Sequence, residues 1–300
     1  MKLLPARLMP GLSVALMERE LKLGFADILV SGSLGDPDPA ASTLVMANHT
    51  CGWDLRVARW LTQQSGLAFS CFTNPSDLQR QPRLAHLGLR AIPRDDPMAA
   101  AMVLRKEGKR LAATPGQALW IYPQGGFFRV DERPVVETGV LGVRASARSV
   151  NFVTVAMHYE LYGPRRAWAW LKVTPVPMPG PRNAAQLGEV LHDAHAALMA
   201  DLRDGTGEYR PILREGSPVM VLDGVPVNVD TLNEFLGLDP KTQGVTVVSD
   251  PAARQLLLTG RPVGASAVLG CLQQNLGKAM ADLVLSHLKG FADAADRQPT

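Results

Sequence analysis

Residues 43–61 read TLVMANHTCGWDLRVARWL, and this stretch passes from a short apolar run into a helical pattern. The run over 43–47 is typical of a buried strand, and the apolar spacing over 55–61 predicts a helix. His49 and Asp54 stand between these two elements, with four residues separating them. Because rigid elements flank the junction, we expect both side chains to be held firmly while they reach a cleft.

The His49/Asp54 pair has two interpretations. In the first it is an acid-base device, since a histidine takes up a proton near neutral pH and a nearby carboxylate fixes its tautomer. Such a device makes a hydroxyl group nucleophilic. In the second, Asp54 caps the helix and His49 is a hydrogen-bonded structural residue. The spacing alone does not separate the two interpretations, and the motifs that follow favour the first.

Strands alternate with helices along most of the chain, and this alternation predicts an α/β fold. We expect a central mixed, partly parallel sheet flanked by helices, with an N-terminal amphipathic helix and a C-terminal α+β appendage. Further strands are expected at 27–30, 67–72, 118–122, 152–157 and 168–173, and helices at 8–25, 82–88, 98–113, 140–149 and 184–202.

The same pattern divides the chain into an N-terminal segment (1–26), a main domain (27–214) and an appendage of unknown role (215–300). In the appendage we expect short strands at 218–229 and 245–248, and a long amphipathic helix at 265–291. The N-terminal helix has two open interpretations. It packs on the core, or it lies on a lipid surface with its Leu/Met side in the lipid and its basic residues at the headgroups. Those basic residues are Lys2, Arg7, Arg19 and Lys22.

Composition narrows the class of protein. The 300 residues are 46% hydrophobic and 20% charged, which predicts a sizeable core. The net charge of +3 is too small to predict a nucleic-acid partner but suits acidic headgroups or phosphorylated substrates. Cys51, Cys71 and Cys271 form neither a disulfide framework nor a metal motif, which favours a reduced, cytoplasmic setting. We expect no signal peptide and no spanning segment, so that any membrane contact is peripheral.

Three more motifs follow the His/Asp pair in a fixed order. The first is Gly88–Arg94, the second is Tyr122–Gly126 with Arg129 after it, and the third covers 151–155. This order and spacing resemble the glycerolipid acyltransferase family, typified by the lysophosphatidate acyltransferases. The resemblance covers about residues 25–175, and its most specific part is the His/Asp motif preceded by Ala-Asn.

The resemblance implies an acyltransferase domain over 27–214, with His49 as general base and Asp54 as the residue that orients it. The acceptor hydroxyl would attack an acyl thioester, and CoA or acyl carrier protein would leave. The sequence contains no dinucleotide-binding fingerprint, P-loop or zinc motif, so we expect no metal and no cofactor beyond the acyl-CoA or carrier-protein donor. The acceptor would be a lysophospholipid or related lipid at the inner face of the membrane. Its phosphate or other anionic groups would meet Arg94, Gln124, Gly125, Gly126 and Arg129.

This chain departs from the family in the motif that usually reads Pro-Glu-Gly-Thr-Arg. Gln124 replaces the acid, Gly126 replaces the threonine, and the next basic residue, Arg129, comes two positions late. Because Gln is neutral and both donates and accepts hydrogen bonds, we expect an acceptor other than an ordinary glycerol phosphate. Two alternatives stay open. One is a catalytically weakened lipid-binding module, and the other is a thioesterase or hydrolase that uses water as acceptor.

Overall fold

The computed structural model describes residues 9–36, 38, 40–128, 134–160, 166–177, 180–204, 206–213, 219–222, 225–228, 245–250, 255–260 and 288–289. The chain divides into two compact units. The first unit comprises residues 1–160, 167–201 and 208–213, and the second comprises 161–166, 202–207 and 214–300.

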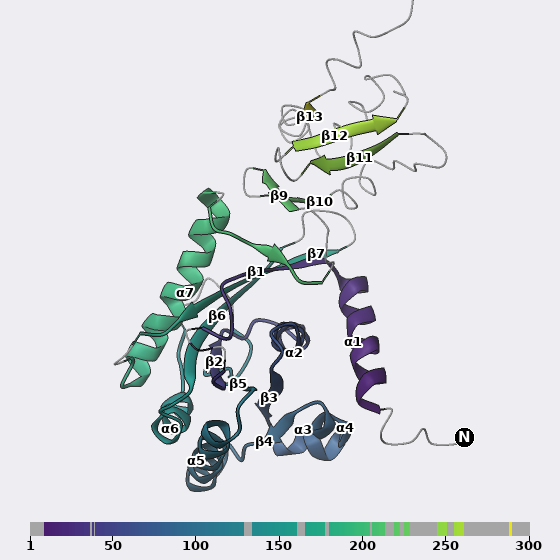
Figure 1. Cartoon of the computed structure of the whole chain (residues 1–300). Coiled ribbons are helices and arrows are strands. Elements are labelled where there is room, and N and C mark those ends of the chain that lie inside the picture. Colours follow the sequence, from purple (N-terminus) through teal and green to yellow (C-terminus); the bar gives the residue numbers. More distant parts are fainter. Residues whose placement is uncertain are drawn as a thin grey trace, which may run out of the picture. The chain divides into compact units, whose positions relative to one another are not determined.

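An eight-stranded mixed sheet forms the centre of the first unit (Figure 1). Its order is β4-β3-β5-β2-β6-β7-β1-β8, and its neighbours are parallel except for the β6–β7 and β1–β8 pairs. The expected α/β fold with a mixed, partly parallel sheet is thus confirmed. The strands are β1 (Phe25–Ser31), β2 (Thr43–Ala47), β3 (Ala68–Thr73), β4 (Leu89–Ala91), β5 (Gln117–Ile121), β6 (Asn151–Glu160), β7 (Ala167–Pro175) and β8 (Arg210–Pro211).

Helices cover both faces of this sheet. Helices α1 (Met9–Gly24) and α2 (Asp54–Gln64) pack on one face, and α5 (Pro97–Ala113), α6 (Gly139–Ser146) and α7 (Ala184–Asp204) pack on the other (Figure 1). Strand β2 is buried on both sides. Val45 belongs to the first core layer, between the sheet and helices α1 and α2, and Leu44 and Met46 belong to the second core layer, between the sheet and helices α5, α6 and α7. This is why its sequence is a continuous apolar run rather than an alternating one. Two short helices, α3 (Pro75–Arg80) and α4 (Arg83–His86), connect β3 to β4.

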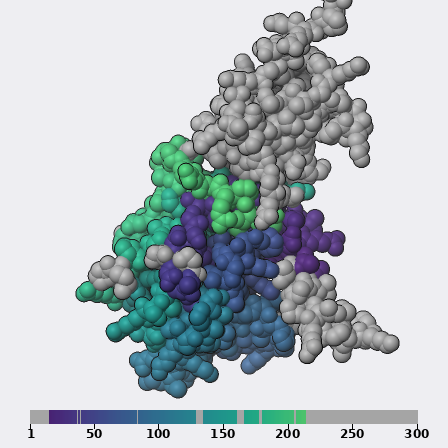
Figure 2. Space-filling model, viewed as in Figure 1, coloured from purple at the N-terminus to yellow at the C-terminus, as the bar shows by residue number. Residues whose placement is uncertain are grey.

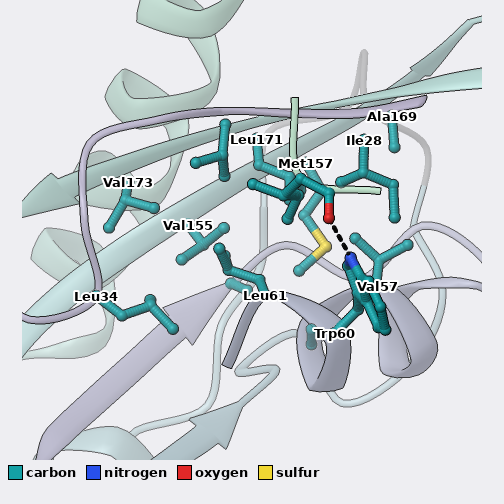
Figure 3. Close-up of a cluster of buried hydrophobic side chains, with 14 of the residues drawn as sticks. Ile28, Leu34, Val57, Trp60, Leu61, Val155, Met157, Ala169, Leu171 and Val173 are labelled. Carbon is teal, nitrogen blue, oxygen red and sulfur yellow. Dashed lines mark hydrogen bonds between the residues drawn. The ribbon is translucent and has the colours of Figure 1, made fainter. Parts of the chain in front are cut away.

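Helix α2 packs on the sheet through the side chains of the first core layer (Figure 3). Val57 and Leu61 from the helix meet Val155 and Leu171 from the sheet. Trp60 adds a directional contact, because its indole N–H donates to the backbone oxygen of Ile212 at 2.8 Å. Helix α2 begins at Asp54, so this packing fixes one end of the His49/Asp54 junction.

Helix α1 packs on the same layer through Met17 and Leu21, which are buried. Leu16 and Leu23 are exposed, and the described part of the helix belongs to the surface seen in Figure 2. The helix therefore packs on the core and still presents apolar side chains outward. Among the helices within the described ranges, none combines the length and apolar character needed to cross a membrane.

The second unit contains β9 (Val219–Leu222) paired with β10 (Val225–Asn228), and β11 (Val245–Asp250) paired with β12 (Gln255–Gly260). Both pairs are antiparallel, and the strands expected at 218–229 and 245–248 are confirmed; β12 was not expected. The helix expected at 265–291 lies outside the described residues except for Leu288–Lys289. Those two residues form β13, parallel to β12, instead of helix.

A histidine cluster lies between α7 and β6. The rings of His195 and His158 have centroids 6.0 Å apart, and His195 Nε2 is buried without a hydrogen-bond partner among the described residues. Burial lowers the pKa of His195 to about 4, and the neighbouring His158 and His192 add to the effect. His195 is therefore neutral in the folded protein at physiological pH.

This cluster predicts acid sensitivity. Between pH 6.5 and about 4 the unfolded chain protonates position 195 while the folded chain does not, so stability should fall as the pH falls through that window. In the His195→Asn variant, the loss of unfolding free energy between pH 7 and pH 4.5 should be smaller by on the order of 1–2 kcal/mol, after allowance for solvent screening. Urea unfolding at pH 7 and pH 4.5 measures the difference. The exposed His86→Asn variant is the control, and a dependence equal in wild type and His195→Asn would contradict the prediction.

Candidate active site

The site forms where two neighbouring parallel strands end. His49 follows β2, and the turn over residues 122–126 follows β5. The connection after β2 begins with α2 on one face of the sheet, and the connection after β5 contains α6 on the other. Adjacent parallel strands whose connections leave on opposite faces create the position at which open α/β sheets bind ligands.

His49 and Asp54 are in direct contact. His49 Nδ1 lies 2.8 Å from Asp54 Oδ2. The Asp54 side chain is 0% exposed and the His49 side chain is 22% exposed, so the carboxylate is sealed while the imidazole reaches the surface. The pair expected from the sequence is thus a formed hydrogen-bonded unit.

Asp54 is held by the loop that precedes its helix. Its Oδ2 accepts the N–H groups of Thr50 at 2.6 Å and of Cys51 at 3.0 Å. The N-cap position of α2 is Trp53. Asp54 therefore organises the 49–51 loop and is not the helix cap that the structural interpretation required.

The charge of Asp54 follows from these contacts. Burial by itself would raise the pKa of Asp54, but hydrogen bonds from His49, Cys51, Tyr159 and Thr50 outweigh it and lower the pKa below its usual value. The ionised carboxylate only accepts hydrogen bonds, so Nδ1 of His49 must carry the hydrogen. Nε2 then holds a lone pair and is the atom that can take a proton.

Two aromatic rings fix the imidazole plane. The Tyr122 ring is stacked on His49 with centroids 4.4 Å apart and an interplanar angle of 23°. The Phe127 ring lies at the same centroid distance with an angle of 53°, and the residue is 64% exposed. Burial raises the pKa of Tyr122 well above its usual value, which keeps the phenol neutral. Phe127 thus adds open apolar surface directly beside the base.

The backbone of the junction is tied to both neighbouring strands. The His49 N–H donates to Gln124 Oε1 at 2.6 Å, and the His49 carbonyl accepts from Phe128 N–H at 2.9 Å. On the other side, the Asn48 amide exchanges two hydrogen bonds with the Met157 backbone, at 2.9 and 2.7 Å. Gln124 therefore positions His49. That task needs only an accepting oxygen, which a glutamine supplies as well as a glutamate.

Arg94 meets the turn after β5. Its Nη1 donates to the Gly125 carbonyl, and its Nη2 lies 2.5 Å from Glu137 Oε1. Gly125 has a φ of +72°, and a Cβ there would lie 2.3 Å from Arg94 Nη2, so both the backbone angle and the close approach favour glycine. Gly126 follows in the same turn, and Arg129 lies outside the described residues.

Hydrogen bonds thus join five of the sequence-predicted residues: His49 and Asp54 directly, and Gln124, Gly125 and Arg94 through the turn. Sequence reasoning missed Tyr159, which helps to lower the pKa of Asp54, and Glu137, which pairs with Arg94. No local signal marks either residue.

Cys51 is not a competing nucleophile. Burial, together with the Asp54 charge, raises the pKa of its thiol, and Sγ lies 3.6 Å from Asp54 Oδ1. A protonated thiol is a poor nucleophile. Over the described residues, no group of three or more His, Cys, Asp and Glu side chains is arranged to hold a metal ion.

Fold and site together define an α/β protein with a His–Asp pair, its aspartate buried and its histidine partly exposed, at the carboxyl edge of a mixed sheet. No protein-family model and no curated protein matches the chain. Among solved structures, the 1-acyl-sn-glycerophosphate (LPA) acyltransferase PlsC from Thermotoga maritima is similar, with 15% sequence identity and a TM-score of 0.45. The similarity covers 67% of this chain and 85% of that one.

Proposed function

We propose that this chain is an O-acyltransferase that moves a fatty acyl group from an acyl thioester to a hydroxyl of a lysophospholipid or related lipid. The observation that carries the proposal is the 2.8 Å contact between His49 Nδ1 and the sealed, ionised Asp54. It leaves Nε2 of a partly exposed histidine as a base. The order of sequence motifs around this pair, which resembles the glycerolipid acyltransferases, supports the same class of reaction.

The reaction needs no residue other than these two for proton transfer. His49 Nε2 takes the proton of the acceptor hydroxyl while the oxygen attacks the thioester carbonyl. The Asp54 charge stabilises the imidazolium that forms. The carbon–sulfur bond then breaks, and the leaving thiolate of CoA or acyl carrier protein takes the proton from His49. Because the substrate hydroxyl is the nucleophile, no covalent acyl-enzyme forms.

Neighbouring groups suit a lipid substrate. The exposed Phe127 gives an acyl chain an apolar contact beside His49. Arg94 offers a planar guanidinium to an anionic part of the acceptor, with Gly125 and Gly126 forming the turn next to it. Arg129, two residues beyond Phe127, would add charge to the same segment.

The proposed substrates suit a protein at the inner face of the membrane, and we assign the contact to α1. Leu16 and Leu23 are seven residues apart on its exposed side, with Arg19 also exposed between them. Glu20 is also exposed between them, and two exposed leucines beside charged residues suit a helix at a lipid surface. Sedimentation with vesicles of anionic phospholipid tests the assignment. The full chain should pellet, and Leu16→Glu with Leu23→Glu should leave it in the supernatant. If the double variant still pellets with the vesicles, the membrane contact lies elsewhere in the protein.

The decisive experiment follows free thiol release from long-chain acyl-CoA and from acyl carrier protein, with and without a panel of lysolipids and glycolipids. We expect release that requires an acceptor and is lost in His49→Ala. His86→Ala, which removes an exposed histidine, is the matched control and should retain the activity.

The other outcomes separate the alternatives. Release without any acceptor, still dependent on His49, would identify a thioesterase with water as acceptor. Lipid binding without release from either donor would identify a binding module. Release that survives in His49→Ala would refute the assigned base.

A further inference from the structure

The anion-binding face of Arg94 is occupied from within the protein. Nη2 of Arg94 is 2.5 Å from Glu137 Oε1, and Nη1 donates to the Gly125 carbonyl. A guanidinium binds a carboxylate or phosphate most strongly through such a pair of nitrogens. An acceptor that brings a phosphate to Arg94 would therefore find a carboxylate already there.

The backbone delivers Glu137 to this position. Its N–H donates to the Pro123 carbonyl at 2.7 Å, which places residue 137 beside the turn that carries Gly125. Gly125 has no side chain, and a Cβ there would lie 2.7 Å from Glu137 Oε1. The close approach of the carboxylate thus depends on the glycine as well as on the charge of Arg94.

The ion pair is nonetheless free to open. The Arg94 side chain is 41% exposed and that of Glu137 is 62% exposed. An exposed pair is weak, because water solvates both charges once they separate. Glu137 can therefore turn into solvent when a stronger anion arrives, without disturbing the core.

The pair also lies next to the catalytic machinery. Gly125, which Arg94 contacts, follows Gln124, whose side chain holds the His49 backbone. An acceptor group bound at Arg94 would thus sit one residue from the contact that positions the base.

We propose that Glu137 is a specificity-determining residue: it competes with the anionic group of an acceptor for Arg94 and so disfavours phosphate-bearing acceptors relative to uncharged ones. The proposal rests on the proposed acyl-transfer function. It explains how the site can carry an arginine suited to phosphate and still discriminate against a simple phosphate monoester. Replacing Glu137 with glutamine keeps the shape and removes the competing charge, so the side chain holds the guanidinium less strongly.

The test compares wild type with Glu137→Gln on two acceptors, lysophosphatidate and the uncharged 1-acylglycerol of the same chain length. We expect KM for lysophosphatidate to fall about three- to tenfold in Glu137→Gln, as expected from loss of an exposed charge pair and of a like-charge repulsion. KM for 1-acylglycerol should not change. Asp95→Asn, which removes the same charge from an exposed position beside Arg94 in the sequence, should change either value less.

A double-mutant cycle shows whether the effect runs through Arg94. In an Arg94→Gln background, Glu137→Gln should no longer improve the use of lysophosphatidate. An improvement that persists there, or one of equal size for 1-acylglycerol, would overturn the proposal. Circular dichroism confirms that each variant is folded.

A direct binding measurement separates this proposal from the proposed function. Isothermal titration with short-chain lysophosphatidate, below its aggregation concentration, should give a Kd three- to tenfold lower for Glu137→Gln than for wild type. If acyl transfer occurs and neither KM nor Kd changes, Glu137 is not a competitor and the function stands. If no acyl transfer occurs but Kd falls, the function fails and the competition stands. No binding to either protein would show that Arg94 is not an anion site.

Discussion

Asp54→Asn should lower kcat for acyl transfer by about 10²–10⁴-fold, the range that a positioned general base contributes. The carboxamide is neutral, so it no longer stabilises the imidazolium. If it turns its NH₂ group toward Nδ1, that nitrogen must become the acceptor, and the hydrogen moves to Nε2. His49 then presents a proton where it needs a lone pair, which is the wrong tautomer for a base.

The measurement is steady-state thiol release across pH 5–9 for wild type and variant. Asp77→Asn is the control, because Asp77 is a carboxylate that accepts a hydrogen bond from Thr73 at 3.0 Å, on α3. It should stay within about twofold of wild type, since removal of a hydrogen bond away from the reacting atoms affects stability by only about 1 kcal/mol. A rate for Asp54→Asn within tenfold of wild type would contradict the assigned role of the pair.

Gly88→Ala should lower the free energy of unfolding by about 2–5 kcal/mol, the sum of left-handed backbone strain and steric overpacking. Gly88 joins α4 to β4 with a φ of +91°, and a Cβ there would lie 2.3 Å from the Phe69 backbone oxygen. That oxygen belongs to β3, which cannot move without breaking its pairing with β4 and β5. The strain therefore has no flexible side chain to absorb it.

Gly66→Ala is the matched control for this prediction. Gly66 also has a positive φ, +71°, but no described atom lies within 4 Å of the Cβ position. Gly66→Ala should lower the free energy of unfolding only through backbone strain, by about 1 kcal/mol. Urea denaturation at constant m measures both changes. Equal losses for the two variants would mean that the contact with Phe69 plays no part.

Local pattern determined the elements of the first unit. The strand expected at 43–47 is β2, with the same bounds, because five consecutive apolar or small side chains can be buried on both faces only in a central strand. The helix expected at 98–113 is α5, which begins one residue earlier at Pro97, a residue preorganised for the first turn. Such features depend on neighbouring residues alone, so the sequence shows them directly.

The contact between His49 and Asp54 was also predictable, since the two residues stand five positions apart at a strand-to-helix junction. Two polar residue types at that spacing restrict the possible arrangements even before the fold is known. The alternative in which Asp54 caps the helix was equally consistent with the spacing of the two residues. Only the position of the Thr50 and Cys51 N–H groups decided between the two interpretations.

Tertiary structure alone decided the surroundings of that pair. Gln124 stands 75 positions from His49, and Glu137 stands 43 positions from Arg94. Tyr159 reaches Asp54 from β6. The contacts of His49 and Asp54 exist because β2 lies between β5 and β6, and strand order is set by the combined burial of all the helices and strands rather than by any one segment. The sequence by itself determined the elements and the reactive pair, and long-range pairing of the strands determined which side chains hold that pair and which one occupies Arg94.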